Sequence, residues 1–247
     1  MSSDPSFPLR AVHLLLIGSA ALWLGWLLLA RADFLYPVAY RVLDIPATLE
    51  GYVPHNRHGK RDFLQTDAAE HARLFAAMAQ AIRHGGEGLE ALRYRAPDGR
   101  ALGTLLTQDE VNHLRDVARL VGPGERAGLL AFLGWLGLVA LMLARGREQP
   151  RARSLLLGSL GLLALAGAAL LAVGPVEAFY ALHRWIFPPD HPWFFYYQDS
   201  LMSSLMQAPR LFGFIGLLWV FTALAILLAL NYSARLAGRL VQYWRIK

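Results

Sequence analysis

Two of the eight histidines stand where an imidazole could transfer protons. His183 lies in the stretch 179–199, which is rich in aromatic rings and prolines, and His113 lies in a segment with helical apolar spacing. A neutral imidazole can accept a proton at working pH and return it. Residue types alone leave two other interpretations open: His183 as an anchor at a membrane interface, and His113 as a helix histidine paired with Asp116.

Other kinds of catalytic or metal chemistry are disfavoured. The chain has no cysteine, which excludes a thiolate metal site, a disulfide and a cysteine nucleophile. His55 and His58 have a metal-like spacing, but basic neighbours crowd them, so we expect neither a metal nor a cofactor. Ser203 and Ser204 lack a nucleophile-elbow motif and are expected to be packing residues.

Four apolar runs must position these histidines. The chain is 55% hydrophobic and only 17% charged, a composition typical of a membrane protein. Each run is long enough to cross a bilayer core of about 30 Å. The first is longer than the apolar centre of a signal peptide, so it is predicted to be a retained helix. The predicted spans are 11–30, 127–144, 154–176 and 211–232.

The charges predict the orientation of the spans. Segment 145–153 carries four arginines against one acid, and the tail 233–247 is purely basic, so both are expected in the cytoplasm. Segment 31–126 has 13 basic and 13 acidic residues, and the segment 177–210, which is predicted to be a loop that carries the aromatic residues and His183, is weakly acidic, so both are expected outside. Anionic lipid headgroups therefore account for the net charge of +6, and no nucleic-acid partner is needed.

The long segment 31–126 is expected to form a small mixed α/β subdomain. Thr66 and Gly85-Gly86 mark the ends of one helix, and Pro97-Asp98-Gly99 predicts a β-hairpin turn. A capping box at 107–110 opens a second helix, which we expect to stop at 122–124. The predicted fold class is an all-α membrane protein, a four-helix bundle with this extracytoplasmic subdomain.

The aromatic stretch and the second helix are predicted on the same side of the membrane, which allows His113 to approach His183. The run Trp193 to Tyr197 has the composition of an interfacial aromatic belt, although a groove for a lipid chain would use the same residue types. The order of these features resembles that of the bacterial lipoprotein intramolecular transacylase family. The resemblance rests on Glu110-x-x-His113-x-x-Asp116, His183-x-x-x-Phe187, Trp193-x-Phe195, Asp199-x-Leu201 and Pro209-x-x-Phe212.

The resemblance implies a histidine-dependent acyltransferase in the bacterial inner membrane, with both termini cytoplasmic and the active site on the outer face. It would move an acyl chain from the diacylglyceryl group of a lipoprotein to the α-amino group of the N-terminal cysteine, without an acyl-enzyme, leaving a lyso-form lipoprotein. His113 and His183 would be catalytic. The supporting candidates are Asp116, Arg184, Arg115, Trp193, Phe187 and Asp199.

The expected partners are the diacylglyceryl lipoprotein and membrane lipids, and the sequence leaves the oligomeric state open. Two other functions also fit the pattern. One is a related acyltransferase with a different lipid or amine acceptor. The other is a non-catalytic membrane scaffold or lipid-binding partner. Replacing either histidine separates an enzyme from a scaffold, because only the enzyme would lose turnover while staying folded.

Overall fold

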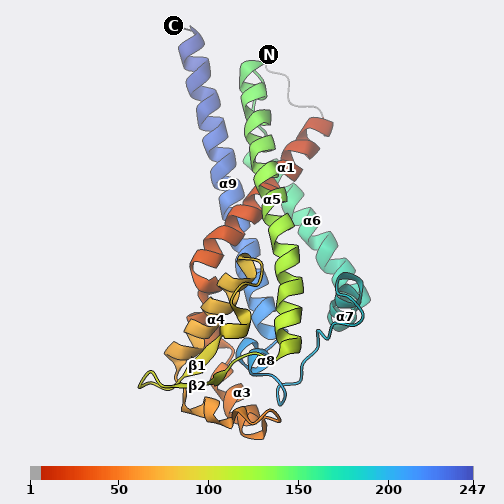
Figure 1. Cartoon of the computed structure of the whole chain (residues 1–247). Helices are drawn as coiled ribbons and strands as arrows, with labels where there is room; N and C mark the ends of the chain where they lie inside the picture. The colour runs from red at the N-terminus through yellow and green to blue at the C-terminus, as the bar shows by residue number, and fades with distance from the viewer. Residues whose placement is uncertain (1–6, 247) are drawn as a thin grey trace. The chain divides into compact units, whose positions relative to one another are not determined.

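The computed structural model describes residues 7–246, and it consists mainly of helices (Figure 1). Four helices are long and apolar enough to cross a membrane: α1 (Phe7–Arg31), α5 (Gln108–Ala144), α6 (Ala152–Val173) and α9 (Arg210–Ile246). The chain divides into two compact units. The helix unit comprises the residues up to Leu28, Gly124–Phe179 and the residues from Leu218 onward. The polar unit comprises Leu29–Pro123 and Tyr180–Leu217.

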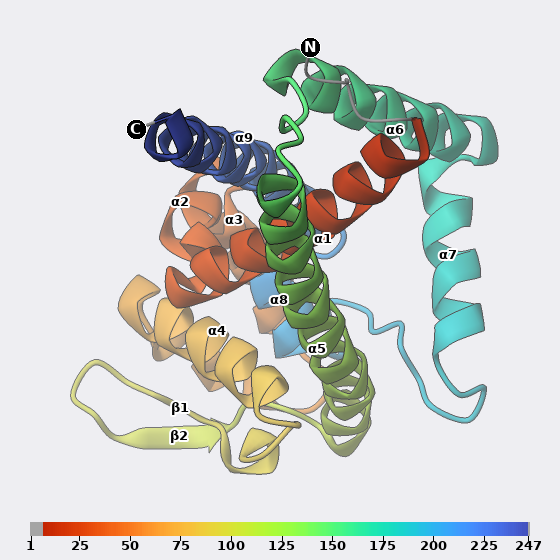
Figure 2. The same cartoon turned by 90° about the horizontal axis from the view of Figure 1, so that it is seen from above.

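The helix unit is held together by apolar and small residues. Its core joins side chains from α1, α5, α6 and α9, which lie near one another in Figure 2. Gly25 and Gly128 allow close approach, since a Cβ on Gly128 would lie 2.3 Å from the Trp23 side chain. Small residues of this kind let membrane helices pack closely. The core residues are Ile17, Ala21, Trp135, Val139, Leu155, Ala223, Leu227 and Ala234.

The polar unit contains the short elements. Tyr36 forms its centre, because its ring stacks on Phe75 at 4.2 Å and its buried hydroxyl donates to the Leu205 carbonyl. This contact ties the first part of the unit to a helix 169 residues later in the chain. The short helices are α2 (Tyr36–Val42), α3 (Ile45–Tyr52), α4 (Ala68–Arg83) and α8 (Leu201–Met206), with 3-10 turns at Asp33–Leu35, Val53–His55, Lys60–Gln65 and Leu89–Ala91. Helix α7 (Pro175–Ile186) belongs to this unit from Tyr180 onward.

The predicted hairpin is present. Strands β1 (Arg93–Arg95) and β2 (Ala101–Thr104) pair antiparallel across the turn at Asp98-Gly99. Gly99 has φ +84°, a conformation that glycine adopts without strain. The Tyr94 hydroxyl donates to Asp62 at 2.7 Å and so fixes the hairpin to the unit. The mixed α/β character expected for this part of the chain is confirmed.

Three local predictions were wrong. Helix α5 continues through Gly122-Pro123-Gly124, where a break was expected, because membrane helices tolerate internal proline and glycine better than soluble ones. Helix α4 is capped by Asp67, whose carboxylate accepts from the Glu70 N–H, and not by Thr66. His183 lies on α7 and not in a loop, because Gly174 at φ +92° ends α6 and Pro175 begins a new helix.

Candidate functional site

His113 and His183 come together in the polar unit from two different helices. His113 lies in the second turn of α5, whose start is fixed by the predicted capping box: the Thr107 N–H donates to the Glu110 carboxylate at 2.5 Å. His183 lies in the last turn of α7. Both side chains are half-buried. The approach of the two histidines expected from the sequence is therefore present.

The Phe187 ring lies against both imidazoles. Its centroid is 4.9 Å from the ring of His113 and 5.3 Å from the ring of His183. The ring centroids of Phe195 and His113 are 5.9 Å apart, and those of Trp193 and His183 are 4.8 Å apart. The site thus holds two imidazoles among the aromatic rings of Phe187, Trp193 and Phe195.

A buried carboxylate links the start of α5 to the start of α8. Glu110 is fully buried and accepts a hydrogen bond from the Ser200 hydroxyl. The Ser200 oxygen in turn accepts from the Ser203 N–H and so caps α8. Because Ser200 follows the aromatic stretch, this network fixes the end of that stretch next to the helix that carries His113.

A second tie joins α5 to the same stretch. The buried Asp116 carboxylate lies 2.5 Å from Nδ1 of His191 and 2.9 Å from the Arg119 guanidinium. The hydrogen bond to Asp116 raises the pKa of His191 above its ordinary value. Asp116 is therefore a partner of His191. Sequence reasoning gave His191 and Ser200 no role, since their partners lie 75 and 90 residues away.

Of the supporting candidates, two form ion pairs with residues outside the histidine pair, and a third is exposed. Arg115 forms an ion pair with Glu90. Asp199 forms one with Arg57 at 3.2 Å. Arg184 lies exposed on α7. Trp193 and Phe187 are the supporting candidates that contact the histidine rings.

His71 and Ser204 have structural surroundings. Nε2 of His71 is 2.6 Å from the Thr66 hydroxyl, which itself donates to the Phe63 carbonyl, and Nδ1 is 2.8 Å from the Tyr40 hydroxyl. This arrangement suits a neutral imidazole, and burial lowers the pKa of His71 to about 4. The Ser204 hydroxyl donates to main-chain carbonyls of its own region.

No group of three or more potential metal ligands occurs within the described residues. The absence of a cofactor remains an expectation.

Comparison with known proteins gives a structural match only. No family model and no curated protein sequence matches the chain. A solved structure of the membrane integral lipoprotein intramolecular transacylase Lit from Bacillus cereus, in a variant with a histidine-to-arginine substitution, matches with a TM-score of 0.63 and 16% sequence identity. The match covers 96% of this chain and 92% of the other. At this level of identity it is the fold that is shared, and the chain is therefore a multi-pass membrane protein with the four-helix fold to which its sequence motifs pointed.

Proposed function

We propose that this chain is a lipoprotein intramolecular transacylase, which moves an O-acyl chain of the diacylglyceryl group to the α-amino group of the N-terminal cysteine. The observation that carries the proposal is the pair His113 and His183, whose rings both contact the Phe187 ring. The shared fold supports the assignment, since the protein with that fold is named for this activity. The product would be a lyso-form lipoprotein.

The reaction needs one group that removes a proton and one that supplies a proton. The α-amine attacks the ester carbonyl, loses a proton, and forms an amide while the bond to the glyceryl oxygen breaks. We assign His183, which lies in the last turn of α7, as the general base. His113 would protonate or position the departing glyceryl oxygen. After both transfers the proton that His113 donated is replaced by the one on His183, so a proton must pass from His183 to His113 before the next turnover.

The aromatic side chains around the two histidines have two roles in this proposal. Phe187, Trp193 and Phe195 present apolar surface that an acyl chain can contact, and they limit water that would hydrolyse the ester. The indole N–H of Trp193 is our candidate for stabilising the oxyanion, because Arg115 is engaged by Glu90 and Arg184 lies exposed. Nucleophile and ester belong to one substrate, so holding them together supplies much of the rate.

The ties from Glu110 to Ser200 and from Asp116 to His191 would act as positioning contacts. They hold the stretch that carries Trp193 and Phe195 against the helix that carries His113. Together with the charge distribution along the chain, the assignment predicts an inner-membrane enzyme with cytoplasmic termini and its site at the outer face.

The test is mass spectrometry of the N-terminal peptide of a reporter lipoprotein from bacterial cells with and without this chain. Fragmentation locates each acyl group. We expect an N-acyl, S-monoacylglyceryl peptide only in cells that contain the intact chain. An unchanged diacylglyceryl peptide in both strains would contradict the proposal, and would direct attention to another acceptor or to a scaffold role.

A further inference from the structure

A cavity of about 200 Å³ lies among three arginines at one end of the helix unit. Arg10 contributes from α1, and Arg151 and Arg153 contribute from the segment that begins α6. Among the described residues, no acidic side chain lines this cavity. The Ser154 hydroxyl donates to the Arg151 carbonyl at 2.8 Å and so fixes the backbone beside the cavity. Such a cluster attracts an anion, because arginine presents several donors in a planar arrangement.

The basic cavity adjoins an apolar one, with which it shares lining residues. The second cavity, of about 410 Å³, shares Arg10, Pro150 and Ser154 with the first and is otherwise lined by apolar residues of α1 and α6. At Gly158 the Leu14 side chain of α1 packs closely on α6, because a Cβ there would lie 2.8 Å from it. The apolar lining is formed by Ala11, Leu14, Leu15, Leu155, Gly158 and Leu162, together with Pro150.

A third cavity, of about 210 Å³, lies between α1, α6 and α9. It shares Leu14, Leu15 and Leu162 with the second cavity and reaches Leu22. We refer to the second and third cavities together as the apolar groove. From Ala11 to Leu22 the groove follows α1 for about 16 Å at the helical rise of 1.5 Å per residue. This length is close to half of a bilayer core of about 30 Å, the depth of one leaflet.

We propose that this groove binds one anionic phospholipid, with its phosphate headgroup among Arg10, Arg151 and Arg153 and one acyl chain between α1 and α6. Charge complementarity determines the headgroup class, and the leaflet-deep apolar groove distinguishes a lipid from a free phosphate ion. Basic pockets between membrane helices commonly bind such headgroups. The proposal is independent of the acyl-transfer reaction.

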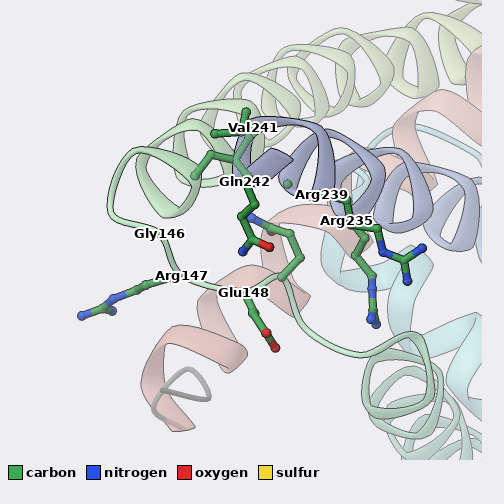
Figure 3. A pocket seen from close by; sticks show the side chains of 10 residues that line it. Gly146, Arg147, Glu148, Arg235, Arg239, Val241 and Gln242 are labelled. Carbon is green, nitrogen blue, oxygen red and sulfur yellow. The ribbon is translucent and has the colours of Figure 1, made fainter. Parts of the chain in front are cut away.

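A neighbouring cavity offers a control of similar charge. It is lined by Arg147, Arg235 and Arg239, but also by Glu148 (Figure 3). Figure 3 shows Arg147 turned away from the two arginines of α9. This cavity shares no lining residue with the apolar groove. Replacing Arg235 and Arg239 therefore removes the same charge as replacing Arg151 and Arg153 while leaving the proposed site intact.

The experiment uses the purified full-length protein in neutral detergent with added phosphatidylglycerol or phosphatidylcholine. Native mass spectrometry measures retained lipid, and a thermal-shift assay gives a second readout. We expect wild-type protein to retain phosphatidylglycerol selectively. Replacing Arg151 and Arg153 together with glutamine should weaken retention by about thirtyfold and abolish the rise in melting temperature. The Arg235→Gln, Arg239→Gln double variant should retain the lipid like wild type.

Two further measurements test whether the lipid occupies the apolar groove. Ala11→Phe adds a ring to the apolar lining and should lower retention without changing the charge. Inorganic phosphate at millimolar concentration should not displace the lipid. Displacement by phosphate, equal loss in the two arginine double variants, or equal retention of both lipids by wild-type protein would each overturn the proposal.

Discussion

The two units differ in how their buried polar side chains are hydrogen-bonded. In the polar unit, Glu110, Asp116 and Ser200 are almost fully buried and each is hydrogen-bonded to a residue distant in the sequence. In the helix unit, His13 and Asn231 are as deeply buried, yet their ring and amide atoms have no hydrogen-bond partner among the described residues. The helix unit therefore depends on apolar packing and small residues, and the polar unit on specific bonds.

This difference suits the proposed roles. A site that transfers protons needs side chains held in fixed geometry, and bonded buried carboxylates supply that constraint. A helix bundle among lipid chains has no such need and packs through small and apolar surfaces. The proposed chemistry accordingly belongs to the polar unit.

The largest expected effect comes from the two histidines of the polar unit. His183→Gln and His113→Gln should each lower turnover of a diacylglyceryl lipopeptide by about 10²- to 10⁴-fold, because each removes one proton-transfer group. The variants should remain folded and inserted. His84→Gln is the control, since His84 is exposed and its Nδ1 lies 2.8 Å from the Gln80 carbonyl of its own helix. Full turnover in both site variants would show that the histidines are structural.

Glu110→Ala should destabilise the polar unit by about 3 kcal/mol. The substitution leaves the Ser200 hydroxyl and the Thr107 N–H without their buried acceptor. The measurement is the denaturant midpoint of the purified protein. Glu87→Ala, at an exposed position, should have little effect. Equal stability of the two variants would remove the contrast between the units.

The sequence predicted the features that depend on short-range patterns. The apolar runs indicated α1, α5, α6 and α9, the Pro97-Asp98-Gly99 turn indicated the hairpin, and the capping box indicated the start of α5. The pairing of His191 with Asp116 could not be predicted, because it depends on how the aromatic stretch folds back over a distant helix. The continuation of α5 through Pro123 was missed because local helix propensity predicts a break at proline and glycine, whereas a membrane helix tolerates them.

The stability of the polar unit should fall on acidification. Burial lowers the pKa of His71 from 6.5 to about 4, so the unfolded chain binds a proton between these values that the folded chain excludes. Stability from this residue is complete above about pH 6.5 and decreases as the pH falls towards 4, by about 3 kcal/mol in total. Urea midpoints measured between pH 4 and 7 should show this slope in wild-type protein. The slope should flatten in His71→Gln, and an unchanged slope would contradict the assignment.

The smallest effect is expected for a buried amide in the helix unit. Asn231→Leu should leave stability unchanged or raise it by about 1 kcal/mol, because the amide atoms have no partner among the described residues. The matched change Asn56→Leu in the polar unit should cost about 2 kcal/mol, since Asn56 accepts from the N–H groups of His58 and Lys60. Melting temperatures of the two variants provide the comparison. A larger loss for Asn231→Leu would reverse the difference between the units.

The most direct measurement of the central claim is an isotope crossover assay with the purified protein. Two diacylglyceryl lipopeptides are mixed, one with deuterated acyl chains and one with a ¹³C-labelled peptide, and the products are identified by mass. Intramolecular transfer predicts that each N-acyl chain stays on the peptide that carried it, and that His183→Gln abolishes both products. Deuterated chains on the ¹³C peptide, or products formed by the His183 variant at the wild-type rate, would contradict the account.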